Sequence, residues 1–548
     1  MQQTQIVRAH TSRTSQLTTG RLQAKRPSFS ILQLVALVVA LITLLPLGYL
    51  AIRGISAGTE GLDYLLSART LTIIWNSIRL AAGVVISATV IGVAVAWITA
   101  RTNLPYRRTW LYASLVPLVT PSFIGAMTFI AAFGPRGYLQ QMLAPLGIER
   151  LPSIYGFFGA WFTITLFTYP YVLLPVRAAL LNMDPALEET ARSLGHNRWS
   201  VFWRITVPQL RPALATGILL TALYTLSDFG AVALMRYNAF TRAIFLQYTS
   251  SFDRNRAAIL ALVLVALALL LVAMERRIAS NTRNYRVGGA STARSARPVE
   301  LRGIWKVAAI VLLALIVTVG LVVPGGVLVG WLAQGLRANV DILNATFITT
   351  TLNTIGAGVI TALIVGVVAL PLAVVATRNN TRLNRWLVNA AYLGNSLPGL
   401  VVALALVFFA ARYLPALYQT FAVLILGYTI RYLPLSIGAT RSALTQINPR
   451  YEEAGRSLGF SPFQVNLRVT IPLVRTGIVG GMALVCLSVM KELPTTLLLA
   501  PTGFKTLTTE IWTAQNEAYL SQVGLPALLL IASSAVSLML ILRNETER

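Results

Sequence analysis

The sequence predicts an all-α polytopic membrane protein with about twelve membrane-spanning helices in two parallel six-helix repeats. Three observations predict this fold class: an apolar composition, long apolar runs separated by short basic connectors, and a polar block that occurs twice. Of the 548 residues, 56% are hydrophobic and 11% are charged, whereas soluble domains have about 25% charged residues. Such a chain needs a bilayer as the solvent for its surface.

Twelve apolar runs are long enough to cross a membrane, since a helix needs about 20 residues to span a hydrocarbon core about 30 Å thick. The predicted spans are 31–53, 71–100, 109–133, 153–176, 213–235, 257–275, 304–330, 350–377, 387–411, 414–437, 477–500 and 523–542. The first run is too long for a signal-peptide core. We therefore expect a retained first helix that follows a basic cytoplasmic tail, residues 1–30.

The formal net charge of +27 would suggest a nucleic-acid partner in a soluble protein. Here the basic residues lie in connectors between apolar runs, as the positive-inside rule expects, so nucleic-acid binding is excluded. They concentrate in alternate connectors, beginning with the N-terminal tail, so both termini are expected in the cytoplasm. The loop from Arg236 to Arg256 is an exception, because it places four arginines on the opposite side.

The polar stretch 276–303 predicts a cytoplasmic linker. It separates repeat 1, residues 31–275, from repeat 2, residues 304–542, and residues 543–548 form a cytoplasmic C-terminus. The single cysteine, Cys486, and the two histidines, His10 and His196, exclude a disulfide framework and a His/Cys metal centre. Neither a metal site nor a catalytic site is expected.

The two halves repeat one another. The segment EETARSLG, Glu188–Gly195, matches EEAGRSLG, Glu452–Gly459, at an offset of 264. Further matches at this offset are Pro185 with Pro449, Arg204 with Arg468, Thr206 with Thr470, Pro208 with Pro472 and Arg211 with Arg475, and matches at an offset of 277 are Asn76 with Asn353, Arg101 with Arg378 and Pro121 with Pro398. The difference between the offsets fits a longer outer loop near residues 134–152. Six helices return the chain to the same side, so the repeats are parallel.

The repeated block is too polar to cross lipid but has helical spacing. Pro185 lies near a helix start, Gly195 at a break and Pro208 at the end of the following segment. This pattern predicts a short helix, a tight turn and a second helix lying along the membrane. The block could cap the bundle, or it could present one face to a groove in a partner. Two copies favour a partner with two matching sockets.

The block resembles the EAA motif in permease subunits of ABC importers. The first copy is Glu189-x-Ala191-x3-Gly195 followed by Ile205-x-Val207-Pro208, and the second is Glu453-Ala454-Gly455-x3-Gly459 with Val469-x-Ile471-Pro472. Thr190 and Gly455 replace alanines of the motif but are also small. The resemblance implies the transmembrane domain of a type I, MetI-like ABC importer, with two coupling helices that dock on an ATPase. The implied coupling residues are Glu188, Glu189, Ala191, Gly195, Pro208, Glu452, Glu453, Gly455, Gly459 and Pro472.

The chain contains no G-x4-G-K-[ST] motif, so ATP is expected on another chain. The resemblance implies a separate cytoplasmic ATP-binding cassette subunit in two copies, a periplasmic substrate-binding protein, membrane lipid as surroundings, and a location in the bacterial inner membrane. The chain itself is expected to be a transport subunit, not an enzyme, with no cofactor of its own. Closure of the ATPase dimer would turn the two halves between inward-open and outward-open forms.

Two polar interruptions follow the repeated block at equivalent positions. They are Ser227-Asp228-Phe229-Gly230 and Lys491-Glu492-Leu493-Pro494, with Asp228 and Glu492 again 264 residues apart. A charge inside a membrane helix costs at least about 2.5 kcal/mol, so it faces a cavity or a partner by default, and Lys491 would partly offset the cost of Glu492. The candidate pathway residues are Ser227, Asp228, Lys491, Glu492 and Pro494. The alternative is a helix end at the outer interface, where charge costs less.

The segments SDFGAVALMRYNAFTRAIFLQY and KELPTTLLLAPTGF, and the NSLPG of Asn395–Gly399, resemble the fused, double-length ferric-iron branch of the permease family. This implies ferric iron, delivered by the periplasmic protein, as the substrate. Transport of thiamine, a polyamine or an oxyanion by the same machinery remains an alternative. A carrier driven by an ion gradient can also have twelve helices in two parallel halves, but it offers no reason for the doubled block.

Overall fold

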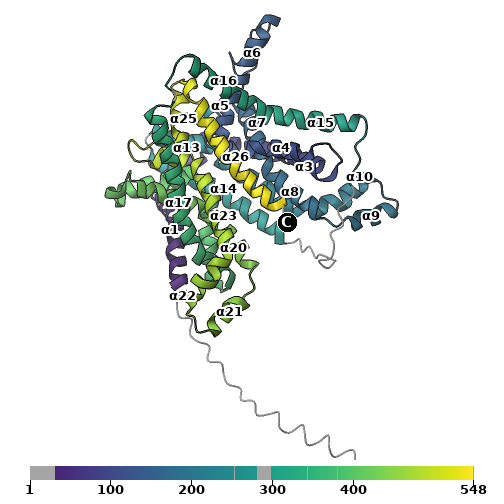
Figure 1. The fold of residues 1–548 in the computed structure, drawn as a ribbon. Coiled ribbons are helices and arrows are strands. Elements are labelled where there is room, and N and C mark those ends of the chain that lie inside the picture. The colour runs from purple at the N-terminus through teal and green to yellow at the C-terminus, as the bar shows by residue number, and fades with distance from the viewer. Residues whose placement is uncertain (1–30, 252, 281–297, 342, 379–380, 547–548) are drawn as a thin grey trace, which may run out of the picture.

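The computed structural model describes residues 31–251, 253–280, 298–341, 343–378 and 381–546, which form a helical bundle (Figure 1). The predicted tail 1–30, linker residues 281–297 and the last two residues lie outside the described part. A single β-bridge, between Thr102 and Val299, is present among the described residues. The predicted all-α class is confirmed.

The first half runs from α1 to α14. Its helices are α1 (Ile31–Ser56), α2 (Gly58–Leu66), α3 (Ala68–Arg101), α4 (Arg107–Val119), α5 (Ser122–Phe133), α6 (Tyr138–Leu143), η1 (Ala144–Leu146), α7 (Phe157–Thr168), α8 (Pro170–Asn182), α9 (Pro185–Ser193), α10 (Arg198–Val201), η2 (Phe202–Thr206), α11 (Val207–Ser227), α12 (Gly230–Leu234), α13 (Phe240–Thr249) and α14 (Arg254–Ser280). Helix α6 lies in the loop between α5 and α7, which is longer than its counterpart between α19 and α20.

The second half repeats this order. Its helices are α15 (Ile304–Val317), η3 (Thr318–Val322), α16 (Val323–Arg337), α17 (Ala345–Arg378), α18 (Arg382–Ser396), α19 (Gly399–Tyr413), η4 (Pro415–Leu417), α20 (Phe421–Thr445), α21 (Arg450–Ser457), α22 (Pro462–Val465), η5 (Asn466–Thr470), α23 (Ile471–Met490), α24 (Pro494–Leu499), α25 (Leu507–Asn516), η6 (Leu520–Gln522) and α26 (Gly524–Thr546). The long helices α3 and α17 have the same length, 34 residues.

Nine helices in the described ranges are long and apolar enough to cross a membrane, or up to eleven if each of two bent pairs is one span. The count of twelve is therefore not confirmed. The last predicted span, 523–542, falls on α26. Its described apolar stretch, Leu520–Ala535, is shorter than the length required of a membrane span. The fifth predicted span, 213–235, is also revised, because its helix runs from Trp199 to Ser227 and stops at Asp228.

Two predicted spans, 109–133 and 387–411, are not straight helices. The chain bends by 100° between α4 and α5, and by 99° between α18 and α19. Both bends lie just before a proline, and the preceding residues, Thr120 and Leu397, are extended. Proline disfavours the α conformation in the residue before it, which explains why both helices break there. Pro121 and Pro398 thus mark matching bends in the two halves.

The prediction that the second helix ends at Pro208 is wrong. After the turn, α10, η2 and α11 continue as one candidate span. A π-turn precedes Pro208, and the Val207 amide bonds the Phe202 carbonyl in that turn. A proline at the first turn of a helix needs no N–H donor, so the helix proceeds through Pro208. Pro472 follows the π-turn η5 in the same way.

The two halves exchange their first helices. Helix α1 packs against α17, α18 and α19 of the second half, and α15 and α16 pack against α4 and α5 of the first. At one such contact, Gln33 Nε2 donates to Asn384 Oδ1 at 3.0 Å. At another, the rings of Tyr49 and Phe409 lie 6.0 Å apart. Each half therefore holds a helix of the other.

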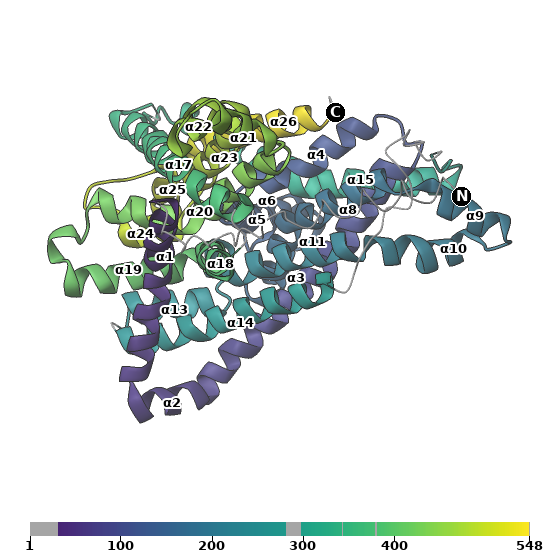
Figure 2. The ribbon, with the colours of Figure 1, turned by 90° about the horizontal axis from the view of Figure 1, so that it is seen from below.

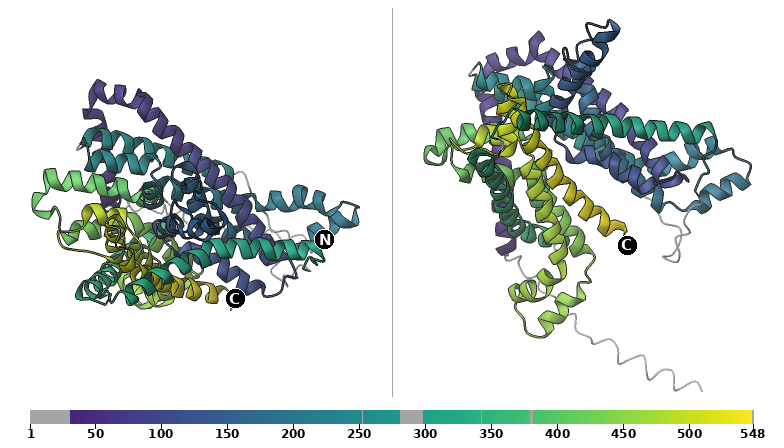
Figure 3. Two further views of the ribbon diagram at one scale, coloured as in Figure 1. Left: turned by 90° about the horizontal axis from the view of Figure 1, so that it is seen from above. Right: turned by 45° about the horizontal axis from the view of Figure 1, so that its top comes forward.

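The two repeated blocks lie at separate extremities of the molecule. Figure 1 shows α9 and α10 at one end and α21 and α22 at another, each at the tip of a group of long helices. The perpendicular view of Figure 2 and both views of Figure 3 show the same separation. A partner that binds both blocks has to reach across the space between these two tips.

Candidate coupling and translocation sites

The first block forms a short helix that ends in a glycine turn. Helix α9 begins after Asp184, whose Oδ1 accepts from the Ala186 amide at 2.9 Å. At the other end the His196 amide donates to the Ala191 carbonyl at 3.1 Å, and Gly195 has φ +87°. Only glycine adopts this left-handed conformation without strain. The predicted helix start and tight turn are confirmed.

The second block repeats this geometry. Helix α21 ends at Ser457, and the Phe460 amide donates to the Gly455 carbonyl at 3.2 Å. Gly459 has φ +86°. Gly455 itself is buried, with Val465 close by, so a residue as small as glycine or alanine suits this position. Ala191 is buried at the equivalent place in α9.

Each block carries an exposed apolar face. Leu194 is 75% exposed and Leu458 is 77% exposed, each next to the glycine of its turn. The other exposed apolar side chains also occupy equivalent positions, 264 residues apart: Leu187 with Tyr451, Trp199 with Phe463, and Trp203 with Leu467. Glu189 and Glu453 are exposed in the same blocks. Large apolar side chains at matching exposed positions are typical of a docking surface.

Glu188 and Glu452 face the interior of the chain instead. They are 8% and 7% exposed. Glu188 Oε1 lies 3.6 Å from Arg101 Nη2 and accepts from Thr206 Oγ1 at 3.0 Å. The sequence grouped both glutamates with the docking residues. Their described contacts are with side chains of this chain.

Glu452 has the equivalent partners. Its Oε1 accepts from Arg378 Nε at 3.1 Å and Nη2 at 3.0 Å, and from Thr470 Oγ1 at 3.4 Å. The arginine and the threonine are the counterparts of Arg101 and Thr206 in the repeat. The sequence showed both matches but assigned no role to them. The spacing of these residues in the sequence could not show that the glutamate carboxylate contacts both the arginine and the threonine.

Asp228 lies in the break between α11 and α12 and is buried. One carboxylate oxygen, Oδ2, accepts from Ser122 Oγ at the start of α5, and Oδ1 accepts from the Ala231 amide at 3.0 Å. Thr241 Oγ1 donates to the Asp228 carbonyl at 2.6 Å. The positive end of the α5 helix dipole also favours a carboxylate here. Asp228 is thus enclosed by protein at the end of α11.

Glu492 occupies the equivalent break between α23 and α24. It is buried, and it pairs with Arg431 Nη1 and accepts from Tyr432 Oη and from Thr495 Oγ1, the last at 2.6 Å. The prediction that Lys491 offsets this charge is wrong. Lys491 is half-buried, and Arg431 on α20 is the cation that pairs with Glu492 among the described residues.

Arg431 is the functional candidate that the sequence interpretation missed. At the repeat offset of 264 it replaces Phe167 of the first half, so the two carboxylates have different partners. Arg431 also lies near the phenol groups of Tyr171 and Tyr224 of the first half. An arginine inside a predicted membrane span was the signal that could have found it.

The remaining pathway candidates flank these carboxylates. Ser227 is the last residue of α11, and Pro494 is the first residue of α24. The rings of Tyr171 and Tyr224 lie 5.5 Å apart, and Tyr224 lies near Asp228. The structure thus brings Asp228, Tyr224 and Arg431 into one polar region where the two halves meet. It offers carboxylate and phenol oxygens together with one guanidinium group.

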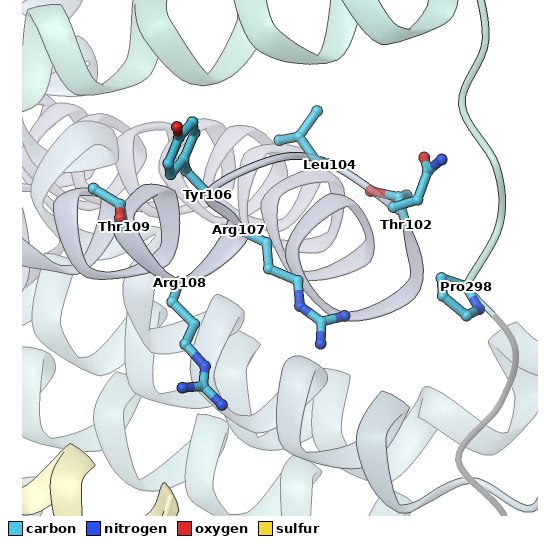
Figure 4. A pocket seen from close by; sticks show the side chains of 8 residues that line it. Thr102, Leu104, Tyr106, Arg107, Arg108, Thr109 and Pro298 are labelled. Carbon is cyan, nitrogen blue, oxygen red and sulfur yellow. The ribbon is translucent and has the colours of Figure 1, made fainter.

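A hollow of about 640 Å³ lies elsewhere, at the loop between α3 and α4. Pro298, just before the second half, closes one side, and Arg107 and Arg108 extend to the same side of the loop (Figure 4). The Val299 amide donates to the Arg101 carbonyl at 2.7 Å, which fixes this strand to the end of α3. None of the predicted site residues lines the hollow.

The sequence pattern of one protein family, described as binding-protein-dependent transport system inner membrane component, matches residues 88–284 and 369–544. The chain belongs to this family. Each match lies in one half, which confirms the two repeats. The chain is accordingly a multi-pass inner-membrane permease of the ABC-importer class.

This permease is similar over nearly its whole length to the Fe(3+)-transport system permease protein FbpB 2 of Haemophilus influenzae. The two are 32% identical over 94% of this chain and 98% of the relative. The sulfate transport system permease protein CysW of Synechocystis is 30% identical over 34% of this chain and 71% of its own length. The probable ABC transporter permease protein y4fN of Sinorhizobium fredii is 26% identical over 74% and 75%.

Among solved structures, a bacterial ABC transporter involved in the import of the acidic polysaccharide alginate aligns with 41% of the permease and 83% of that chain. The TM-score is 0.33 and the identity is 16%. Similarity at this level carries no conclusion about the permease.

Proposed function

We propose that this permease moves ferric iron, delivered by a periplasmic binding protein, into the cytoplasm, and that a separate ATP-binding cassette subunit drives it. The observation that carries the coupling is the exposed apolar face that recurs at each glycine turn, with Leu194 in one half and Leu458 in the other. A single chain with two equivalent faces suits two copies of one ATPase subunit. ATP binds to that subunit.

The coupling surface comprises the exposed part of each block. Glu189 and Glu453 would meet polar groups of the ATPase, and Leu194 and Leu458 would fill its groove. Gly195 and Gly459 set the direction of each turn. Both blocks, and with them both termini, would lie on the cytoplasmic side. The boundaries 31–275 and 304–542 divide the chain into two repeats that the ATPase moves against each other.

Ferric iron is supported by the long relative and by the chemistry of the polar region. The Fe(3+) permease matches 94% of the chain, whereas the sulfate permease CysW matches 34%. A hard cation is bound by oxygen ligands, and Asp228, Glu492 and Tyr224 supply carboxylate and phenol oxygens there. These groups would form a transient site between the halves. Pro494 and Ser227 would allow the flanking helices to bend there.

An oxyanion such as sulfate is the second candidate, and Arg431 is the observation that favours it. A guanidinium group fits an oxyanion by paired hydrogen bonds. Glu492 already neutralises this arginine, however, so an anion would have to displace a carboxylate. A cation bound by Glu492 would equally have to displace Arg431, so the preference for iron rests on the Fe(3+) permease that matches 94% of the chain.

The test uses proteoliposomes that contain the full chain and its ATPase subunit. Radiolabelled ferric iron on the binding protein and radiolabelled sulfate are supplied outside, with ATP or a non-hydrolysable analogue inside. The proposal predicts iron uptake that requires ATP hydrolysis and no sulfate uptake. Sulfate uptake without iron uptake would favour the second candidate, and uptake that follows an ion gradient without ATP would contradict both.

The docking face is tested separately by Leu194→Gln with Leu458→Gln. Both side chains are exposed, so the chain should fold as before. Capture of the ATPase subunit by the immobilised variant should fall by at least about tenfold, since apolar anchors dominate binding at interfaces. Leu343→Gln, at an exposed position of the loop between α16 and α17 and outside the blocks, is the control. Equal capture by all three proteins would contradict docking at these faces.

A further inference from the structure

We infer that α3 and α17 are rods that transmit the movement of each coupling helix to the translocation region, and that Glu188 and Glu452 are the positioning residues that fasten the coupling helices to them. This inference rests on the proposed function, since it assumes that an ATPase moves α9 and α21. It assigns Glu188 and Glu452 a role other than docking.

At the block end of each rod, the fastening is an ion pair with a buried carboxylate; the arginine side chain is 6% exposed in the first half and 18% exposed in the second. Arg101 is the last residue of α3 and Arg378 is the last residue of α17. Their partners, Glu188 and Glu452, are enclosed by the chain, so an ATPase cannot reach these carboxylates. The neighbouring Glu189 is exposed instead. The same carboxylates also accept from the threonines that end the π-turns, which ties α9 to the start of α11 and α21 to the start of α23.

At the opposite end of each rod, polar side chains hold the segment that follows the carboxylate break. In α3, Asn76 Nδ2 donates to the Asn238 carbonyl at 3.1 Å, and Ser77 Oγ accepts from the Phe240 amide at 3.0 Å. This segment follows α12, and Thr241 within it bonds the Asp228 carbonyl. One end of α3 is thus linked to Asp228 and the other to α9.

The second half has the same linkage. In α17, Asn353 Nδ2 donates to the Lys505 carbonyl at 3.0 Å, and Thr354 Oγ1 accepts from the Leu507 amide at 2.8 Å. The following residue, Thr508, donates to the Glu492 carbonyl at 3.0 Å. The rod residues occupy matching positions of the repeat. The segments that they hold are equivalent after an insertion of three residues in the second half, since Lys505, Leu507 and Thr508 follow Asn238, Phe240 and Thr241 by 267 residues and not by 264. Chance contacts would not recur in this way.

The helix between these ends can carry the movement. Asn76 and Arg101 are 25 residues apart, as are Asn353 and Arg378, which corresponds to about 38 Å at 1.5 Å per residue. Both helices are continuous over this stretch, with α17 running through Pro371 and α3 having no internal proline, and coupling between distant sites can travel through such elements and the hydrogen bonds at their ends. Pulling the coupling helix therefore shifts the segment beside Asp228 or Glu492.

The two fastenings differ in tightness. Arg378 makes two hydrogen bonds to Glu452, at 3.1 and 3.0 Å. Arg101 approaches Glu188 only to 3.6 Å, and its Nε and Nη2 atoms are buried without a hydrogen-bond partner. Buried donors without partners are unfavourable. The fastening of the first half is therefore the looser one, and it has unused donors with which to tighten when α9 moves.

The test compares three double variants of the full chain, reconstituted with its ATPase subunit. Glu188→Gln with Glu452→Gln loosens the block end, Asn76→Ala with Asn353→Ala loosens the far end, and Glu189→Gln with Glu453→Gln alters the docking face. ATPase capture, ATP hydrolysis and iron uptake are measured for each. In the first two variants, ATPase capture and ATP hydrolysis should stay within about twofold of the wild type. Their iron uptake should fall by at least about tenfold, which is within the usual range of coupling between two sites.

The docking variant should instead lose ATPase capture. Combining both rod variants should reduce uptake no further than either alone, since both interrupt the same path. Normal uptake in the Glu188/Glu452 variant, or loss of ATPase capture equal to that of the docking variant, would overturn the inference. Failure of the wild-type chain to bind an ATPase would overturn the proposed function itself.

A charge reversal separates positioning from folding. If the Glu188/Glu452 variant is not recovered folded, the double variant Arg378→Glu with Glu452→Arg tests the inference instead. It keeps an ion pair between the two positions, with the two charges exchanged. Arg378→Glu alone places two carboxylates together and should abolish uptake. Partial return of uptake in the reversed pair supports the inference, and a folded reversed pair that transports no better than Arg378→Glu overturns it.

Discussion

Arg431, with a side chain that is 19% exposed, forms an ion pair with the buried carboxylate of Glu492 where the two halves of the permease meet. Glu492 is 5% exposed, and its carboxylate also accepts from a tyrosine and a threonine. The first half has a phenylalanine, Phe167, at the position that corresponds to Arg431. The polar region is thus asymmetric although the fold repeats.

Removing Arg431 should destabilise the chain strongly. Arg431→Met leaves the Glu492 carboxylate buried without its cation, and breaking a buried pair in this way typically costs about 3–5 kcal/mol. Thermal unfolding of the detergent-solubilised chain measures the effect. Arg431→Met with Glu492→Met should recover most of the stability, because no charge is left unpaired. A single variant as stable as the wild type would show that the pair is not buried in solution.

The hydroxyl of Ser122 should stabilise Asp228 by a smaller amount. Ser122→Ala removes the donor to Oδ2 and leaves a buried acceptor unsatisfied, at a cost of about 1–3 kcal/mol. Ser114→Ala is a matched control, because the Ser114 hydroxyl is buried and has no hydrogen-bond partner. Unfolding of the two variants in denaturant gives the comparison. Equal stability of both would contradict the Ser122 contact.

Gly399→Ala should displace Arg431 from Glu492. A Cβ atom at Gly399 would overlap Arg431 Nη1 and crowd Glu492 Oε1. Overpacking of this kind typically costs about 1–3 kcal/mol. Gly356→Ala, in the interior of α17 with nothing near its new Cβ atom, should leave the melting temperature unchanged or raise it. If Gly399→Ala is as stable as Gly356→Ala, the close approach of α19 to Arg431 is wrong.

Much of this fold could be predicted from residue periodicity and repetition. The glycine turns at Gly195 and Gly459 were recognisable because glycine and polar residues recur at fixed spacing. The bends at Pro121 and Pro398 were not, although both prolines were found as matches. A long apolar run satisfies the length test whether it is straight or bent, and the proline alone does not give the bend angle.

Side-chain partners across helices were harder to predict. Lys491 is adjacent to Glu492 in sequence, so proximity along the chain suggested the wrong cation. Arg431 comes from another helix, and its distance from Glu492 depends on how α20 packs against α24. In the same way, the matched Arg101 and Arg378 gave no sign that they bind Glu188 and Glu452.

The glycine turns should be sensitive to substitution for conformational reasons alone. Gly195→Ala with Gly459→Ala adds no steric overlap, but each alanine would have to adopt a positive φ, at a cost of about 1–2 kcal/mol. The turns should open and ATPase capture should weaken. Gly438→Ala, which also meets nothing within 4 Å but lies in the interior of α20, is the control. Undiminished capture by the double variant would show that turn geometry is not required for docking.

The most direct test of an iron importer coupled through these two blocks is uptake of radiolabelled ferric iron by cells that lack this chain, complemented with wild type or with Gly195→Asp, Gly459→Asp. We predict that the wild type restores uptake and that the double variant, inserted in the membrane at the same level, does not. Iron uptake that is unchanged by deletion of the chain would contradict the substrate, and normal uptake by the double variant would contradict coupling through the blocks.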